Sequence, residues 1–300
     1  MRKHVFIVNP KAGRGAGRRT LNELPGRLTG WPNEYQIIET SGPGEASEIA
    51  RSVDSEVCVA VGGDGTINEV VNGLIGTNRT LAILPSGSGN DFAKSIGIPK
   101  STAAALEIIR AGKSKSIDVG TVACGANSDS RNQSKRLFAN GVGIGFDAAV
   151  AAKTLEIPHL SGTMLYLVAV LKTLGKYRSP LFHISIDGRT TVSHNLLIAI
   201  GNGICAGGGF YLTPDAKVDD GQLDVCLVEE MSIAGILQLM PRVMKGKHGT
   251  FKGVEFQRGA CVSIHGDAPF FVHADGEIVG DGVTDVQVSL VDQSLSVIVG

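Results

Sequence analysis

The stretch that decides the fold of this chain is residues 57–74, VCVAVGGDGTINEVVNGL. Its first five residues are apolar and favour a strand buried on both faces. A glycine turn containing one acid follows, and then apolar residues recur at the spacing of one helix face: Ile67, Val70, Val71 and Leu74. A glycine turn at a helix N-terminus is suited to bind phosphate through backbone N–H groups. Because Asp64 would repel a phosphate, we expect a cation between them; the alternative is a tight turn that binds nothing.

The composition limits the classes to which the chain can belong. A length of 300 residues with 43% apolar and 19% charged residues predicts about two domains with sizeable cores. The net charge of −1 gives no sign of a nucleic-acid partner. The five cysteines are scattered and form no CxxC pair, which favours reduced thiols. No window approaches about 18 uninterrupted apolar residues, and the N-terminal apolar run is too short for a signal peptide. We therefore expect a cytoplasmic protein that meets any membrane from the aqueous side.

Strands alternate with helices in the first 120 residues. Strands are expected at residues 4–8, 35–40, 57–61 and 81–84. This alternation predicts a parallel sheet with right-handed crossovers, and ligands of such sheets lie beyond the carboxyl ends of the strands. Glycine turns follow Val8, Val61 and Leu84, so all of them fall on that edge. We predict a three-layer α/β nucleotide-binding domain over residues 1–120.

Strands dominate after a polar stretch at residues 124–134. They are expected at residues 137–142, 181–186, 192–200, 222–228, 254–256, 260–265, 270–273 and, in two pieces, 286–299. The pair Asp187-Gly188 is typical of a hairpin turn. Of two interrupting helices, 162–176 and 232–245, the first is apolar nearly all round, as in a buried packing helix or the wall of a lipid pocket. We predict a β-sandwich-like domain over residues 121–300.

The residues at the three turns match what phosphoryl transfer needs. That chemistry requires donors for phosphate oxygens, acids to hold Mg²⁺ and a base for the acceptor hydroxyl. The turns supply glycines, the acids Asp64 and Asp91, and a basic residue, Lys11 or Arg14. The chain has no GxxxxGK[ST] and so is not a P-loop NTPase.

Several motifs in a fixed order resemble the diacylglycerol kinase catalytic-domain family, which includes soluble bacterial lipid kinases and the sphingosine and ceramide kinases. The motifs are NPKAGRG at 9–15, GGDGTINEVVNGL at 62–74, LPSGSGNDFAKSIGIP at 84–99, IDVG at 117–120, FANGVGIGFDA at 138–148, PDAKVDDGQLDV at 214–225 and HADGE at 273–277. GGDGT is shared with NAD kinases and phosphofructokinases, whereas LPSGSGND and DGE are specific. The resemblance covers nearly the whole chain and implies a lipid-binding second domain.

The resemblance also implies roles for individual residues. It implies that ATP is bound by Asn9, Pro10, Lys11, Ala12, Gly13, Thr40, Gly62, Gly63, Asp64, Gly65, Thr66, Ile67, Asn68, Glu69 and Ser88. It implies a catalytic Mg²⁺ network of Asp64, Asp91 and Asp118. A structural Mg²⁺ would be held by the carboxylate of Asp220 and the backbone carbonyls of Lys217 and Gln222.

Glu277 resembles the general base that deprotonates the lipid hydroxyl, although it could instead cap a turn. Asp147 either contacts a polar lipid headgroup or caps a helix. Arg14 stands where some bacterial relatives carry lysine, and its role at the triphosphate is open. His265 and His273 are expected to be satisfied structural histidines rather than catalysts.

The expected function is ATP- and Mg²⁺-dependent transfer of a phosphate to a lipid hydroxyl. Diacylglycerol is the default acceptor, with phosphatidylglycerol or a sphingoid base as rivals. An NAD-kinase-like enzyme with a soluble acceptor and a nucleotide-binding regulatory module without catalysis are the alternatives. The expected partners are a membrane-derived lipid substrate and a membrane contacted peripherally, with no nucleic acid; a homodimer is a further option. Lys245, Lys247 and Lys252 form either a membrane contact patch or a solvated loop.

Overall fold

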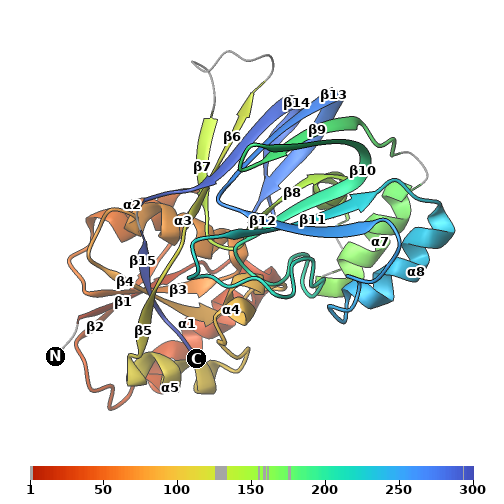
Figure 1. Cartoon of the computed structure of the whole chain (residues 1–300). Coiled ribbons are helices and arrows are strands. Elements are labelled where there is room, and N and C mark those ends of the chain that lie inside the picture. The colour runs from red at the N-terminus through yellow and green to blue at the C-terminus, as the bar shows by residue number, and fades with distance from the viewer. Residues whose placement is uncertain are drawn as a thin grey trace. The chain divides into compact units, whose positions relative to one another are not determined.

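The computed structural model describes residues 3–125, 134–154, 156–157, 160, 162–174, 177–292 and 294–300 (Figure 1). The chain folds into two compact units. Unit 1 is Met1–Val119 with Asp292–Gly300, and unit 2 is Gly120–Val291. The predicted second domain, 121–300, is therefore corrected at its C-terminal end, because residues 295–298 form a strand in the sheet of unit 1. Residues 126–133 of the predicted polar linker and 175–176 of the predicted apolar helix lie outside the described residues.

Unit 1 is an α/β fold. Within its described residues, the sheet order is β2-β1-β3-β4-β15-β5, and every neighbouring pair is parallel except β15 and β5. The strands are β1 (His4–Val8), β2 (Tyr35–Glu39), β3 (Val57–Gly62), β4 (Thr80–Pro85), β5 (Ser114–Ile117) and β15 (Leu295–Ile298). The helices are η1 (Ala12–Gly15), α1 (Ala16–Arg27), α2 (Glu45–Ser52), α3 (Asp64–Leu74), α4 (Asp91–Ser95) and α5 (Thr102–Ala111).

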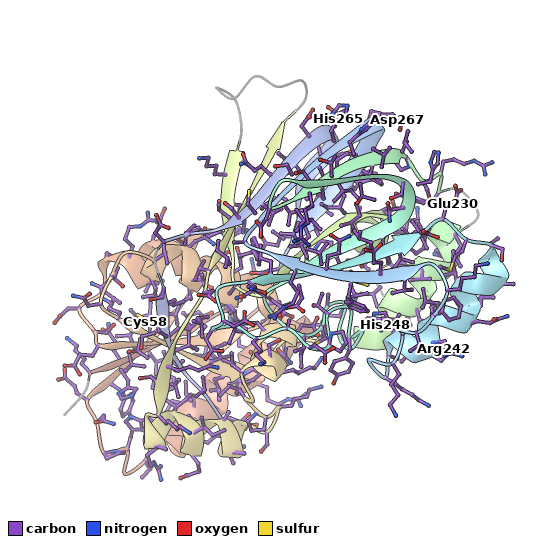
Figure 2. The ribbon with its side chains drawn as sticks, viewed as in Figure 1. Cys58, Glu230, Arg242, His248, His265 and Asp267 are labelled. Carbon is purple, nitrogen blue, oxygen red and sulfur yellow. The ribbon has the colours of Figure 1, made fainter. Side chains whose placement is uncertain are left out.

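The centre of this sheet is apolar throughout. Strands β1 and β3 are buried along their whole length, as strands covered on both faces must be. Cys58 lies inside β3 and is fully buried (Figure 2). The predicted apolar stripe of α3 is buried against the sheet at Ile67, Val70, Val71 and Leu74. The predicted parallel α/β architecture is confirmed.

Unit 2 is built from antiparallel strands. Its sheet order is β12-β11-β10-β8-β13-β14-β6-β7, and β9 pairs with both β10 and β13. The strands are β6 (Gly120–Gly125), β7 (Ser134–Phe138), β8 (Gly141–Gly145), β9 (Leu181–Ile186), β10 (Arg189–Gly201), β11 (Leu223–Glu229), β12 (Val254–Gly259), β13 (Cys261–Ala274) and β14 (Glu277–Leu290). The helices are α6 (Phe146–Thr154), α7 (Gly162–Leu174) and α8 (Ile233–Val243). The Asp187-Gly188 hairpin joins β9 to β10, with φ of 45° and 83°.

Two apolar cores stabilise unit 2. One is formed by strand residues alone, among them Phe138, Phe182 and Val272. The other packs helices against strands and includes Val170 of α7, Ile236 of α8 and Cys226 of β11. These layers confirm the predicted β-sandwich-like architecture. Among the described residues, no helix has the length and apolar character to cross a membrane.

One predicted strand of unit 2 is divided. The expected strand at 137–142 ends at Phe138 and resumes as β8 at Gly141. Between them, Ala139 and Asn140 donate their backbone N–H groups to the carboxylate of Asp275. The chain leaves the β-sheet at these two residues because their backbone N–H groups donate to the side chain of Asp275 instead of to a neighbouring strand. In contrast, the two pieces expected at 260–265 and 270–273 form one strand, β13, with register shifts inside it.

Candidate active-site elements

The three glycine turns of unit 1 follow adjacent strands and bind one another. Strands β1, β3 and β4 pair residue by residue, so their carboxyl ends align (Figure 1). Asn9, after β1, donates its amide Nδ2 to Thr66 Oγ1 at 3.0 Å. Ser86 and Gly87, after β4, donate backbone N–H groups to the carbonyl of Gly62 at 2.8 and 3.1 Å. The turns thus form one connected structure at the predicted edge of the sheet.

Glycine is required where these turns touch. A Cβ atom on Gly13 would lie 2.2 Å from the carbonyl oxygen of Ser86. A Cβ on Gly87 would lie 2.3 Å from the Cα of Gly63. Both distances are far below van der Waals contact, and the atoms that would be struck are backbone atoms that cannot rotate away. The glycines therefore hold the three turns together as well as opening their backbone to a ligand.

Asp64 joins the second turn to the third. Its Oδ1 accepts the backbone N–H of Asp91 at 2.7 Å and that of Phe92 at 3.4 Å, at the start of α4. The buried carboxylate of Asp91 accepts Lys94 Nζ at 2.9 Å. The structure thus brings together two acids that the sequence placed on one edge. Asp118 is half-buried in the connection after β5, and its part in the acidic network stays a prediction.

The other predicted nucleotide residues divide into surface and interior positions. Ser88 and Lys11 are exposed, and Lys11 Nζ lies 3.5 Å from the carbonyl oxygen of Ser41. Thr40 is buried beside the end of β1, where its N–H donates to the carbonyl of Val8. Asn68 is fully buried, and the carboxylate of Glu69 accepts the N–H of Ala46 in α2 at 3.2 Å. Asn68 and Glu69 thus have roles inside the fold, and contact of this set with a nucleotide stays a prediction.

In unit 2, Glu277 begins β14 directly after a tight turn. Asp275 and Gly276 form that turn with φ of 48° and 85°, the combination of a type I′ hairpin. The carboxylate of Glu277 is half-exposed and accepts a hydrogen bond from the guanidinium of Arg136 on β7. A carboxylate offers about four lone-pair sites. Glu277 is therefore oriented by Arg136 and keeps the capacity to accept a proton.

Asp275 fixes the hairpin against the interruption between β7 and β8. Its carboxylate accepts the backbone N–H groups of Ala139, Asn140 and Gly141 at 3.0, 3.0 and 2.9 Å. Hydrogen bonds to an ionised acceptor are about twice as strong as neutral ones. The turn that carries Glu277 is therefore rigidly held.

A buried histidine–aspartate pair supports the same turn. His273 Nε2 lies 2.8 Å from Asp147 Oδ2, and the N–H of Gly276 donates to His273 Nδ1 at 3.4 Å. Because Nδ1 accepts, Nε2 carries the proton and donates to Asp147. A Cβ on Gly143 would clash with both side chains, at 2.2 Å from His273 Nε2 and 2.3 Å from Asp147 Oδ2. Asp147 lies in the first turn of α6, is 2% exposed and pairs with His273. A contact between Asp147 and a lipid headgroup stays a prediction.

The predicted structural Mg²⁺ site stays a prediction. Asp220 supplies the only predicted carboxylate ligand, and that carboxylate is ion-paired with Arg258 and accepts the N–H of Gln222 at 3.2 Å. Arg258 also lies 3.4 Å from Asp224 Oδ2, where burial raises the carboxyl pKa and the guanidinium opposes that rise. The guanidinium of Arg258 thus lies beside the one predicted carboxylate ligand of this site.

The acids of unit 1 are the predicted holders of a catalytic Mg²⁺. Among the residues that the structure describes, no group of three or more His, Cys, Asp or Glu side chains could hold a metal by itself. Mg²⁺ keeps several waters and binds through one or two carboxylates together with substrate phosphates. Asp64 and Asp91, beside a glycine turn, are carboxylates of the kind that such a site would use.

Sequence reasoning missed Arg136 and gave no role to Asp275. Arg136 follows a polar stretch and has no motif around it, so nothing in the local pattern marks it. Asp275 lies inside HADGE, where its position before Gly276 in a two-residue turn was a usable signal. Positive φ at a non-glycine residue favours Asp or Asn.

Unit 1 has a parallel sheet with interlocked glycine turns and paired acids, and unit 2 has an antiparallel, sandwich-like sheet. This combination defines the class of two-unit kinases that use a nucleotide as phosphate donor. Residues 3–122 match the diacylglycerol kinase catalytic domain. Residues 140–299 match the YegS C-terminal NAD kinase beta sandwich-like domain. The chain belongs to the diacylglycerol kinase catalytic-domain family.

Related proteins match this chain over nearly its full length and theirs. A protein named diacylglycerol kinase from Mycobacterium tuberculosis is 30% identical over 92% of this chain and 88% of its own. One of the same name from Staphylococcus saprophyticus is 28% identical over 93% and 90%. A Bacillus anthracis structure described as a diacylglycerol kinase has a TM-score of 0.71 at 25% identity and covers 100% of this chain and 97% of its own. Yeast NADH kinase shares the fold, with a TM-score of 0.57 at 13% identity over 100% of this chain and 84% of its own.

Proposed function

We propose that this protein is an ATP- and Mg²⁺-dependent lipid kinase that phosphorylates the hydroxyl of diacylglycerol to give phosphatidic acid. One observation carries the proposal. Asp64, which lies in the interlocked glycine turns, accepts a hydrogen bond from the backbone N–H of Asp91 at the start of α4. The relatives are named diacylglycerol kinase, and from that name we infer diacylglycerol as the acceptor. The phosphate turns belong to unit 1, and the proposed base belongs to unit 2.

The turns of unit 1 are proposed to bind and orient the triphosphate. The first N–H groups of a helix have no partner within it, and those at the start of α3 follow the glycine turn after β3. Such preorganised donors stabilise negative charge without rearranging during the reaction. Bound Mg²⁺ would neutralise phosphate charge, and Asp64 and Asp91 are the residues that would hold it, directly or through water.

Glu277 is proposed to take the proton of the lipid hydroxyl. The hydroxyl oxygen then forms a bond to the γ-phosphorus as the bond from that phosphorus to the β–γ bridging oxygen breaks, so that ADP leaves and Glu277 holds the proton. Arg136 and the Asp275 turn orient the carboxylate for this step. General-base catalysis of this kind contributes roughly 100- to 10,000-fold.

The test is transfer of label from γ-labelled ATP to diacylglycerol in detergent micelles. Asp64→Ala and Glu277→Gln are expected to lose at least about 100-fold in turnover with unchanged circular dichroism. Glu255→Gln, an exposed acid on β12 of the same unit, is the matched control and should retain full turnover. Full turnover in Asp64→Ala or Glu277→Gln would contradict the mechanism.

The acceptor is tested in the same assay with a lipid panel and with NAD. Labelled phosphatidic acid is the expected product. Label in phosphorylated sphingoid base or in a phosphorylated phosphatidylglycerol would change the substrate, and label in NADP would replace the lipid kinase by a kinase of a soluble acceptor. Binding of ATP without transfer to any acceptor would point to a regulatory module.

A further inference from the structure

Helix α8 of unit 2 carries apolar residues on two sides. Its inner side contributes Ile236, Leu239 and Val243 to the helix-facing core. Its outer side carries a second apolar stripe, at Ile233, Leu237, Pro241 and Met244. Ile233 is 53% exposed, Leu237 48% and Met244 39%. A surface helix of a water-soluble protein normally places polar residues on that side, so the outer stripe of α8 calls for a partner.

Residues 231–253 carry only positive charges around this stripe, and the exposed acids Glu229, Glu230 and Glu255 stand just outside them. Residues 231–253 contain no Asp or Glu, and their basic residues are Arg242, Lys245, Lys247 and Lys252. All of these basic side chains lie at the surface. Figure 2 shows Arg242 at the end of α8, with its guanidinium carbon 5.4 Å from the centre of the Phe251 ring. An apolar stripe bordered by basic residues is the pattern of a helix that lies in the interface of an anionic bilayer.

Helix α7 repeats the pattern. Met164 is 59% exposed and Leu171, two turns later, is 54% exposed, while Val170 packs into the same core as α8. Residues 157–186 also contain no Asp or Glu. The two helices lie together at one end of unit 2 (Figure 1). Unit 2 therefore carries two neighbouring helices with exposed apolar residues and no acids.

We propose that the outer face of α8 together with residues 244–252, here called the α8 face, docks unit 2 onto an anionic lipid bilayer. A second copy of the chain is a poorer partner, because an interface between identical faces would bring the same positive charges together. The proposal rests on the proposed function only in expecting a lipid substrate. Membrane binding itself can be measured without ATP or catalysis.

The test is co-sedimentation of the full chain with vesicles of phosphatidylcholine alone or mixed with phosphatidylglycerol. The wild type is expected to bind the anionic vesicles and to be released by salt. Ile233→Glu/Leu237→Glu should lower binding at least tenfold. Lys245→Ala/Lys247→Ala should lower binding to anionic vesicles roughly thirtyfold, which corresponds to about 1 kcal/mol for each basic residue.

Matched controls make the same kinds of substitution outside the α8 face, so that an effect of position can be told from an effect of the substitution itself. Val192→Glu replaces an apolar residue on β10 that is 51% exposed, and Lys100→Ala/Lys113→Ala removes two exposed charges from unit 1. Both controls should bind vesicles like the wild type. Equal binding by the α8-face variants and the wild type would overturn the proposal. So would a wild-type dimer in light scattering that Ile233→Glu/Leu237→Glu dissociates, because a second copy would then cover the face.

A kinase assay with a short-chain, water-soluble diacylglycerol and no vesicles distinguishes the two proposals. The α8-face variants should retain wild-type turnover in it, because the glycine turns and Glu277 are unchanged. Loss of turnover there would show that the α8 face affects the reaction itself and would overturn a purely docking role. Vesicle binding by a wild type that phosphorylates no lipid would contradict the proposed function and leave docking standing.

Discussion

The two units form their parts of the candidate site in different ways. In unit 1 the site is mostly backbone: turns after neighbouring strands approach so closely that only glycine fits, as at Gly13 and Gly87. In unit 2 it is side chains that meet from distant parts of the chain. Arg136 and Glu277 are 141 residues apart, and Asp147 and His273 are 126 apart.

This difference predicts which kind of substitution should inactivate the residues of each unit. A backbone site fails when an added atom separates the turns, and no neighbouring side chain can move to compensate. A side-chain site fails when one partner is removed, and a substitute with the same hydrogen-bonding atoms can restore it. Substitutions that add an atom in unit 1 and that remove or mimic a partner in unit 2 test the comparison.

The largest effect is expected for Gly87→Ala. Its Cβ would lie 2.3 Å from the Cα of Gly63, so the second and third turns must separate. We expect turnover to fall by more than about 100-fold, the scale on which misplaced catalytic geometry acts, with weaker ATP binding by calorimetry. The control is Gly26→Ala in α1, where a Cβ meets nothing within 4 Å and alanine favours the helix by up to about 1 kcal/mol. Normal turnover in Gly87→Ala would show that the turns do not depend on close packing.

The next effect is expected for Asp147→Ala, which leaves the buried Nε2–H of His273 without its acceptor. Stability should fall by roughly 1–3 kcal/mol, and kcat should fall about tenfold while the KM for ATP is unchanged, because the Glu277 turn loosens and unit 1 does not. Asp147→Asn keeps an oxygen that can accept this hydrogen and should restore most of kcat. If the asparagine and alanine variants were equally slow, a positioning role through His273 would be wrong.

A smaller loss of stability is expected for Arg258→Ala. The side chain of Asp224 is 8% exposed, and its pKa is raised by burial, which Arg258 opposes. Without Arg258 that pKa rises further, so unfolding should be easier by about 1–2 kcal/mol at pH 7. The deficit should shrink as the pH is lowered toward 4, because protonation removes the buried charge. Thermal unfolding across pH measures this, and a deficit independent of pH would exclude Asp224 as its cause.

Asp220→Asn tests the predicted structural Mg²⁺ site, in which the carboxylate of Asp220 is ion-paired with Arg258. If Arg258 occupies the position of the cation, the rise in melting temperature on adding Mg²⁺ should be the same in the wild type and in Asp220→Asn. A rise that only the wild type shows would restore the metal site.

The smallest effect concerns His248, which is fully buried in unit 2 with Nε2 3.3 Å from the carbonyl oxygen of Leu212 (Figure 2). Burial lowers its pKa below the ordinary value of 6.5. The unfolded chain therefore takes up a proton first, and stability should fall as the pH drops below 6.5. His248→Gln, which keeps a donor for Leu212, should lose this part of the pH dependence of melting. An unchanged dependence would assign the effect to other groups.

The architecture of unit 1 was open to prediction because its signals are local. Residues 57–74 contain a buried strand, a glycine turn and a helix stripe in succession, and each signal arises within a few residues. The edge on which the turns meet follows from the parallel sheet. Strand β5, SKSI, has only one buried residue, and its partner β15 lies at the far end of the chain, so neither signalled its place in this sheet.

The site in unit 2 was less predictable for the same reason. A sequence pattern can identify Glu277 through its motif, but it cannot show that Arg136 reaches it across the sheet. Asp147 could be read as a helix cap because its neighbours in sequence form a helix, whereas its actual partner, His273, comes from β13. The ion pair between Arg258 and Asp220 likewise depends on the pairing of β11 with β12.

The position of β15 has a consequence for how the chain acquires its structure. This strand pairs with β4 and β5, and Thr80 Oγ1 lies 3.1 Å from Ser296 Oγ, 216 residues away. During synthesis the first unit emerges long before the strand that separates β4 from β5, so both strands must wait with unpaired edges while all of unit 2 is made. Such long-range closure slows folding and exposes the nascent sheet to aggregation. The sheet that carries the glycine turns is therefore begun before unit 2 is translated and completed only after it.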